Sequence, residues 1–388
     1  MDFSFPPEMV AFRRMVREFA EEEVRPLAAV IDREDRVPWE TIPKLRQAGL
    51  LGVPFPRDYG GAGLGEMGYC ILMEEMGRVC TSTATLIGAH IGIGAMAIYL
   101  GGNEEQKRKY LVPLAQGEKL AAFALTEPSA GSDAAAIRTR AIRQGDRYIL
   151  SGNKIYITNG SFADIISVMA LTDPALGARG GATAFIVEKG FPGFKVGTIE
   201  RKMGIRGSAT AELIFDEVEV PAGNVLGQVG MGFIVFMQTL DIGRVTLGAA
   251  CLGGAQAALE MAIRYAKVRE RFGRPLAHLQ AVQFTIAEMA AEIEALRSLV
   301  YRTAWLVDTG QPFTKEAGMC KLLGSEIASR CVERALQIHG ALGYSRDFPM
   351  ERMVRDSRIA EIFEGTNEIQ RIVIATELFR EVGVRIRP

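Results

Sequence analysis

The chain has 388 residues, with 45 Lys and Arg against 46 Asp and Glu, so its formal net charge is -1. A nucleic-acid partner requires a basic surface, and this balance gives no reason to expect one. Hydrophobic residues make up 48% of the chain, which is typical of a globular protein with a large core and two or three domains. The five cysteines and three histidines are scattered without metal-ligand spacing. We therefore expect no disulfide and no metal site, so carboxylates, hydroxyls or a bound cofactor must carry any chemistry.

The first part of the chain, from Met9 to about Leu120, has the spacing of amphipathic helices, with apolar residues at steps of three and four from Met9 to Phe19. The most apolar stretch, Thr83 to Leu100, contains His90 and several glycines. It is too short and too interrupted for a membrane span, so we interpret it as a buried helix. The first ten residues fit neither a signal peptide nor a transit peptide, and we expect a cytoplasmic protein with no membrane partner.

Residues Gly63 to Gly68 match the GxGxxG pattern of dinucleotide-binding proteins. That pattern binds a pyrophosphate when a strand precedes it and a helix opens on it. The preceding residues, Val53 to Asp58, include two prolines and cannot form a central strand. We interpret the match as a loop.

Between Ala121 and Gly232 the pattern changes to short β-branched or aromatic runs separated by Gly, Asn, Asp and Pro. These runs indicate a compact antiparallel sheet with tight turns, and no helical pattern alternates with them. The strands that we predict are Tyr148–Leu150, Lys154–Thr158, Ile165–Leu171, Thr183–Glu188, Phe194–Ile199 and Ala211–Val220.

After Gly232 helical spacing returns. Apolar residues from Val282 to Val300 recur at alternating steps of four and three, which predicts a long helix in a bundle. Gly310 and Pro312 end this helix, and another is expected from about Thr314 to Ile338. The predicted fold class is α+β, with an N-terminal helical domain (1–120), a middle antiparallel β domain (121–232) and a C-terminal four-helix-bundle domain (233–388).

Three polar segments stand out from this apolar background. Residues 123–133, FALTEPSAGSD, combine small residues and hydroxyls, which lets backbone amides approach a flat polar ligand, although an ordinary turn fits equally well. In residues 156–160, YITNG, an aromatic ring and a hydroxyl share one strand face; a plain hairpin is the alternative. In residues 359–369, Glu364 lies between Phe363 and Gly365, where loss of solvation would raise its pKa toward neutrality. A solvated glutamate at a helix end remains the alternative.

Together, and in this order, the segments resemble the acyl-CoA dehydrogenase family over nearly the whole chain. The matching motifs are LTEPSAGSD, RERFGRPL from Arg269, QIHGALGY from Gln337 and IFEGTNEIQR, with DYGG and GNEEQKRKYL earlier in the chain. The resemblance implies an FAD enzyme that oxidises an acyl-CoA to its trans-2-enoyl-CoA in fatty acid β-oxidation and passes electrons to electron-transfer flavoprotein. It also implies a homotetramer built from two dimers. The chain is most similar to the short-chain, butyryl-type group, so we expect a short- to medium-chain substrate.

The resemblance also implies roles for single residues. Glu364 would take the α-proton while a hydride leaves the β-carbon for the flavin, and the Glu364 N–H would stabilise the thioester oxygen. Isovaleryl- and long-chain-type members carry the base directly before the arginine of a DxxR segment, where this chain has Gly243 before Arg244. The implied substrate contacts are Ser132, Asp241, Arg244, Phe363 and Gly365. The implied FAD contacts are Phe123, Leu125, Thr126, Gly131, Ser132, Tyr156, Ile157, Thr158, Arg269, Phe272, Gln280, Gln337, Gly340, Ala341, Thr366 and Asn367.

Several positions depart from the family pattern. Phe123, Tyr156 and Phe363 replace a common Tyr, Trp and Tyr, and each keeps an aromatic face for packing. His339 replaces an aliphatic residue, and we favour a buried histidine over a contact with the cofactor. The alternative function is a flavin-dependent acyl-CoA or nitroalkane oxidase-like enzyme that uses oxygen. Nitroalkane oxidases have Asp at the position of Glu364 and acyl-CoA oxidases are longer, so we prefer the dehydrogenase.

Overall fold

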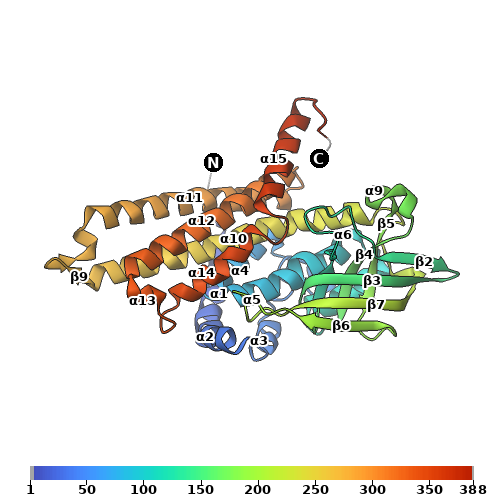
Figure 1. Ribbon diagram of the computed structural model, residues 1–388, viewed down its shortest axis with the longest axis horizontal. Helices are drawn as coiled ribbons and strands as arrows, with labels where there is room; N and C mark the ends of the chain where they lie inside the picture. Colours follow the sequence, from blue (N-terminus) through green and yellow to red (C-terminus); the bar gives the residue numbers. More distant parts are fainter. Residues whose placement is uncertain (1–3, 387–388) are drawn as a thin grey trace.

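The computed structural model describes residues 4–386. The molecule is elongated: a β-sheet forms one end, and long helices run from it to the opposite end (Figure 1). Shorter N-terminal helices pack against the long helices and against the sheet. The α+β fold class predicted from the sequence is confirmed. The domain boundaries stay predictions, although the first strand begins at Ala121 and the first long helix begins at Gly232.

The N-terminal part is helical, as expected. Its helices are α1 (Pro7–Phe19), α2 (Arg25–Glu34), α3 (Thr41–Gln47), α4 (Gly65–Gly77), α5 (Thr81–Ile87), α6 (Met96–Gly101), α7 (Glu104–Gln106) and α8 (Val112–Ala115). The helical turns η1 (Ala20–Val24), η2 (Arg57–Tyr59), η3 (Gly88–Ala95) and η4 (Lys107–Leu111) connect them. On α1 the predicted apolar face buries Val16, while Met15 stays partly exposed at its edge.

Two helical stretches, Thr81–Gly101 and Gly232–Val268, are long and apolar enough by composition to cross a membrane. Their most apolar windows are 67% and 72% buried inside the fold. Thr81–Gly101 is made of α5, η3 and α6 and contains the stretch that we predicted to be a buried helix. Burial against other protein elements explains the apolar composition of both stretches as that of core helices.

Of the GxGxxG match only Gly63 and Leu64 lie in a loop as predicted; Gly65 begins α4, so the rest of the match is helical and the loop interpretation is wrong there. Among the described residues, a turn and η2 precede the match, and no strand does. The backbone N–H groups of Glu66 and Met67 donate to the Asp308 carboxylate at 2.6 and 3.0 Å. The helix N-terminus that a phosphate would need is therefore occupied by a side chain of the protein.

The middle part forms one sheet with the strand order β6-β7-β3-β2-β4-β5-β8, and β1 pairs with β4. Its strands are β1 (Ala121–Ala124), β2 (Arg140–Gln144), β3 (Arg147–Thr158), β4 (Ile165–Leu171), β5 (Ala182–Glu188), β6 (Phe194–Ile199), β7 (Thr210–Pro221) and β8 (Val225–Leu226), with the short helical segments η5 (Pro174–Leu176), α9 (Ala178–Gly181) and η6 (Ala222–Asn224) between them. Most pairings are antiparallel, as predicted, but β1 and β2 pair with β4 in parallel. The sequence prediction missed these two strands and split β3 in two.

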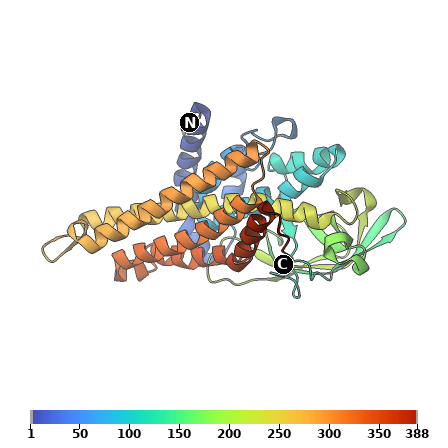
Figure 2. The ribbon, with the colours of Figure 1, turned by 90° about the horizontal axis from the view of Figure 1, so that it is seen from above.

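The C-terminal part is a helical bundle. Its elements are α10 (Gly232–Val268), the short hairpin β9 (Glu270–Arg271) and β10 (Arg274–Pro275), η7 (Leu276–His278), α11 (Gln280–Asp308), α12 (Thr314–His339), α13 (Ala341–Tyr344), α14 (Met350–Ser357), η8 (Arg358–Glu361) and α15 (Asn367–Glu381). Met289, Ile293, Leu296 and Val300 of the predicted seam are buried on α11. Figure 2 shows α10 between α11 and α12, reaching the sheet at one end. Because α10 also packs on α4, it connects all three parts of the chain.

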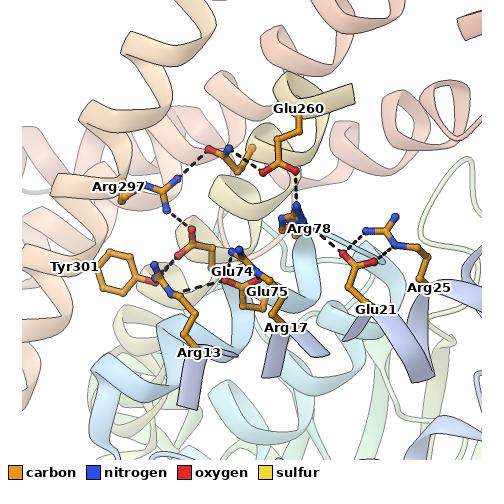
Figure 3. Close-up of polar contacts among 11 residues, drawn as sticks. Arg13, Arg17, Glu21, Arg25, Glu74, Glu75, Arg78, Glu260, Arg297 and Tyr301 are labelled. Atoms are coloured by element: carbon orange, nitrogen blue, oxygen red, sulfur yellow. Dashed lines mark hydrogen bonds and ion pairs between the residues drawn. The ribbon is translucent and has the colours of Figure 1, made fainter. Parts of the chain in front are cut away.

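Ion pairs join the N-terminal helices to the bundle (Figure 3). The Glu74 carboxylate on α4 accepts a bond from Arg13 of α1 at 2.8 Å and also contacts Arg297 of α11. Beside it, Glu75 pairs with Arg17 through two bonds of 2.8 Å. We call the whole set the α4 ion-pair network; its other members are Glu21, Arg25, Arg78, Gln256, Glu260 and Tyr301.

Candidate active site

A cavity of about 1360 Å³ lies where the sheet, α10 and the segment before α15 meet. It brings together residues that are far apart in the sequence. Predicted site residues around it are Phe123, Leu125, Thr126, Gly131, Ser132, Tyr156, Ile157, Thr158, Asp241, Arg244, Phe363, Glu364, Gly365 and Thr366. Asn367 is buried directly behind this wall. The three polar segments singled out in the sequence therefore line one site.

Glu364 sits in a sharp turn between η8 and α15. Its φ is +53°, in the left-handed region that residues other than glycine seldom adopt, and Gly365 follows at +87°. The Glu364 carbonyl accepts bonds from Arg244 Nε at 3.4 Å and Gln370 Nε2 at 3.3 Å. The Thr366 hydroxyl accepts the Ile369 N–H at 3.4 Å and caps α15. Bonds on both sides thus hold a strained turn that directs the glutamate into the cavity.

The Glu364 carboxylate is poised for proton transfer. Its Oε2 atom is shielded from solvent and has no hydrogen-bond partner within residues 4–386. Loss of solvation raises the pKa of Glu364 to about 7, and the positive charges of Arg244 and Lys321 oppose that rise. A carboxyl group with a pKa near 7 can accept a proton at neutral pH and release it again. Of the two alternatives left open by the sequence, the shielded Oε2 atom and the raised pKa favour the desolvated glutamate over the solvated one.

Gly243 on α10 leaves room for this carboxylate. A Cβ atom at position 243 would lie 2.7 Å from Glu364 Oε2 and 3.0 Å from Ile93 Cγ2. Any larger side chain there would compete with Glu364 for the same space. The missing side chain at 243 and the glutamate at 364 therefore fit each other.

The FALTEPSAGSD segment is held in place from behind by a buried ion pair. Lys154 donates to the Glu127 carboxylate at 2.7 Å and to the Leu125 carbonyl at 2.9 Å. Glu127 also accepts the backbone N–H groups of Arg138 and Thr139, at 2.6 and 3.1 Å. Lys154 and Glu127 are almost completely buried, so the segment, which turns at Glu127 to Ala130, is fixed as a wall of the cavity.

Tyr156 presents an aromatic face at the same wall. Its φ is +58°, and 61% of the residue is exposed beside the cavity. An exposed aromatic ring next to hydroxyls is suited to packing against a flat polar ring system. The hydroxyl-bearing Thr126, Ser132 and Thr158 lie around it. The site therefore fits the isoalloxazine ring of FAD on its chemistry, and Glu364 lines the same cavity.

Arg244 is less available than the sequence suggests. It is buried and donates to Asp241 Oδ1 at 2.7 Å, while Asp241 Oδ2 accepts the Thr314 hydroxyl at 2.8 Å. The Asp241 carboxylate thus balances the charge of Arg244. A contact between Arg244 and the CoA moiety stays a prediction, as do the other individual roles.

A second group of predicted residues lies far from the cavity. Arg269, Phe272, Gln280, Gln337, Gly340 and Ala341 surround the β9–β10 hairpin and the end of α12, opposite the sheet (Figure 1). Phe272 is 91% exposed at the tip of that hairpin. Within one chain these residues do not approach the cavity, so a contact with FAD requires a second subunit and stays a prediction.

His339 is buried at this distal end, and the absence of a contact between it and the cofactor stays a prediction. Its ring stacks on Tyr265 at a centroid distance of 4.5 Å and packs against Phe348 at 4.8 Å. Nδ1 lies 2.7 Å from the Ala335 carbonyl oxygen, whereas Nε2 has no partner in the described part of the chain. Burial lowers the pKa of His339, so the ring is neutral at neutral pH.

Sequence reasoning missed two buried lysines that support the site, Lys154 and Lys321. Both are completely buried, and each lies behind a predicted functional segment. A signal was present for Lys321, because it shares a helix face with the small residues Ala317 and Gly324. A lysine on a small, apolar helix face is rarely buried without a polar partner.

The three-part fold and a shielded carboxylate that lines a large cavity define an enzyme of the acyl-CoA dehydrogenase type. Comparison with known families supports that class: residues 6–118, 122–218 and 230–379 match the acyl-CoA dehydrogenase N-terminal, middle and C-terminal domains. The chain therefore belongs to the acyl-CoA dehydrogenase family, and its cofactor is FAD.

Individual relatives cover nearly the whole chain. It is 46% identical to the short-chain specific acyl-CoA dehydrogenase of Clostridium acetobutylicum, over 98% of this chain and 100% of the relative. It is also 46% identical to the acryloyl-CoA reductase (NADH) of Anaerotignum propionicum, over 98% of this chain and 96% of the relative. A similar solved chain belongs to the structure "Electron transferring flavoprotein of Acidaminococcus fermentans: Towards a mechanism of flavin-based electron bifurcation". It is 45% identical, its TM-score is 0.96, and the match covers 98% of this chain and 100% of the solved one.

Proposed function

We propose that the protein oxidises short- to medium-chain acyl-CoA thioesters to trans-2-enoyl-CoA, with Glu364 as the base. The observation that carries the proposal is the Glu364 carboxylate, shielded and unpartnered at the cavity wall within the described residues, with a pKa raised to about 7 by desolvation. The likeness to a short-chain specific relative supports the substrate range.

Each part of the site has a task in this reaction. Oε of Glu364 accepts the α-proton of the thioester. The backbone N–H of Glu364 stabilises the charge that develops on the thioester oxygen, and the bonds to its carbonyl from Arg244 and Gln370 hold that peptide unit in place. Thr126, Ser132, Tyr156 and Thr158 hold and orient the isoalloxazine ring. Bound FAD supplies the acceptor for the β-hydride.

The wider setting is also part of the proposal. The likeness to a chain from an electron-transferring flavoprotein structure supports electron-transfer flavoprotein as the acceptor. The distance between the distal group around Phe272 and the cavity of the same chain supports a homo-oligomer, for which we propose the tetramer of the family. We further propose a cytoplasmic enzyme of fatty acid β-oxidation. Sedimentation of the purified holoenzyme tests the oligomer.

The test of the base compares two glutamates from the same segment. Glu364→Gln keeps the shape of the side chain but cannot accept the proton, so turnover with butyryl-CoA and an artificial electron acceptor falls about 10³-fold. Flavin absorbance and acyl-CoA binding are retained. Glu361→Gln is the matched control, because Glu361 is occupied by the Ser329 hydroxyl at 2.8 Å and by Arg358. Near wild-type turnover in Glu364→Gln would contradict the proposal.

Two competing activities are separated by the fate of the electrons. A dehydrogenase loses its yellow colour anaerobically with acyl-CoA and reoxidises slowly in air, whereas an oxidase forms peroxide rapidly. The likeness to an acryloyl-CoA reductase raises a third possibility, the reverse reaction. Rapid reduction of an enoyl-CoA by NADH in the presence of electron-transfer flavoprotein, with slow acyl-CoA oxidation, would favour the reductase.

A further inference from the structure

Lys321 is a buried cation that the proposed reaction does not use. It lies on α12 with 0% of its surface exposed, and its Nζ donates to the Asn367 side-chain oxygen at 2.8 Å. The same oxygen accepts the Ser325 hydroxyl at 3.1 Å. Among residues 4–386, no carboxylate oxygen lies within ion-pair distance of Lys321. A buried ammonium group held by a neutral amide is costly and requires an explanation.

The acceptor of Lys321 connects it to the turn that carries the base. Asn367 begins α15, three residues after Glu364 and directly after the Thr366 cap. The Lys321 and Ser325 bonds therefore fasten the first turn of α15 to α12. Gln370, one turn further on, holds the carbonyls of Glu364 and Gly365. The end of the strained turn is thus anchored on the buried lysine.

Near Glu364, Lys321 is the positive charge that no carboxylate pairs with in the described chain, because the other groups around the base are either paired or neutral. On α10, Arg244 is paired with Asp241, and burial raises the pKa of Cys251 to about 12, so that thiol is neutral. On α4, burial raises the pKa of Tyr69 well above 10, and its phenol is neutral too. On η8, Glu361 is bonded to Ser329 and Arg358.

We propose that Lys321 is a positioning residue for Glu364, whose ammonium group anchors α15 through Asn367 and favours the ionised form of the base. This inference rests on the proposed function, because it assigns Lys321 a part only if Glu364 is the base. Lys321 touches neither substrate nor FAD and exchanges no proton with them. At neutral pH it stays protonated, and the substrate proton moves to Glu364.

The electrostatic surroundings agree with this geometry. Burial lowers the pKa of Lys321 to about 8, and the charges that oppose this decrease include that of Glu364. Conversely, Lys321 is one of the two cations that oppose the raised pKa of Glu364. Removing the lysine charge therefore makes Glu364 harder to ionise and moves the acid limb of the pH–rate profile upward.

The decisive measurement is the pH dependence of kcat/KM for the holoenzyme with butyryl-CoA. In Lys321→Met the acid limb moves up by about half a pH unit or more, so that activity at pH 6.5, relative to the high-pH plateau, falls about threefold. Lys321→Arg restores the charge and moves the limb back. Ser325→Ala is the matched control, because it removes a bond to the same Asn367 oxygen and leaves the charge, so its limb does not move.

The outcomes separate an electrostatic role from simple packing. A Lys321→Met enzyme whose activity drops by the same factor at every pH would overturn the proposal. If Lys321→Met does not fold or does not retain FAD, Asn367→Asp is measured instead, because a carboxylate at position 367 neutralises the charge of Lys321 without removing the lysine. An acid limb that does not move in Asn367→Asp overturns the proposal. High turnover in Glu364→Gln would instead disprove the proposed function, whatever the lysine variants show.

Discussion

Two regions of the molecule treat their glutamates in opposite ways. In the α4 ion-pair network, Glu74 and Glu75 are 3% and 1% exposed, and each carboxylate meets at least one arginine (Figure 3). At the cavity, Glu364 is half-buried as a residue, and its Oε2 atom is shielded from solvent without a partner in the described chain. Both regions withdraw a glutamate carboxylate oxygen from solvent, so the presence or absence of a partner is what distinguishes them.

The partners of each carboxylate decide what it can do. A paired carboxylate keeps its charge and fastens two helices together, because breaking the pair would leave an uncompensated charge in the interior. An unpaired one is destabilised in its ionised form, so its pKa rises and it becomes a base that works near neutral pH. The network therefore supports the fold, while the site carries an energetic cost that the reaction uses.

The largest expected effect comes from breaking the network. Glu74→Gln removes the carboxylate that Arg13 and Arg297 share, leaves them only the longer pairs with Glu75 at 3.7 Å and Glu294 at 3.3 Å, and lowers the free energy of unfolding by about 3 kcal/mol. The exposed parts of both arginines reduce the loss by taking up water. Urea unfolding of wild type and variant at equal protein concentration measures it. The acid limb of kcat/KM should not move in the variant; a moved limb would mean that the two regions are coupled.

The next effect concerns the activity of the wild-type protein across pH. Because the pKa of Glu364 is raised to about 7, the base is protonated below that pH, and kcat/KM falls about tenfold for each further pH unit. Because the base is half ionised at pH 7, the loss between pH 7 and pH 5 is about fiftyfold. Steady-state rates in constant-ionic-strength buffers, with substrates of equal binding affinity, test this. A limb near pH 4.5 would show that Glu364 is solvated or paired in the working enzyme.

A smaller effect is a gain in stability when the base is removed. The folded protein binds the Glu364 proton more tightly than the unfolded chain does, so this group lowers stability as pH rises from about 4.5 to 7, and the cost stays constant above. Glu364→Gln removes that cost and stabilises the holoenzyme at pH 8 by about 1–3 kcal/mol, with little difference at pH 4.5. Thermal unfolding at both pH values checks this. Lower stability of the variant at pH 8 would place Glu364 with the paired glutamates.

The sequence predicted the architecture well because periodicity reports burial. Strands β4 and β6 have the predicted bounds, and α12 ends one residue after the prediction. The prediction missed strands where hydrophobic and polar residues do not alternate. β1 is four buried residues, three of them alanine, and β2 is mostly exposed and polar. The predicted turn at Gly152 is a register shift within the single strand β3, where Gly152 has φ +150°.

The site could be predicted in part, for a related reason. Polar residues in local motifs, such as Glu364 and Thr126, can be recognised in the sequence because their neighbours are apolar. Contacts between residues far apart in the sequence cannot be recognised in this way. The sequence therefore predicted neither the contact between Lys321 and Asn367 nor the one between Lys154 and Glu127. It also could not show that Asp241 already occupies Arg244. Long-range partners therefore had to come from the structure.

The smallest expected effect tests how closely the unpaired carboxylate is fitted to its surroundings. In Gly243→Ala the new Cβ would lie 2.7 Å from Glu364 Oε2, so the carboxylate must move by several tenths of an ångström. Because proton abstraction depends on position, kcat falls about tenfold while FAD content is unchanged.

Gly254→Ala on the same helix is the control for the change in helix propensity. Its Cβ meets the Gly77 carbonyl oxygen at 3.8 Å, an ordinary contact, so kcat stays within about twofold of wild type. Equal losses in the two variants would mean that α10 tolerates no added methyl group anywhere. A loss confined to Gly243→Ala would show that the empty position on α10 is part of what leaves Glu364 unpaired and able to react.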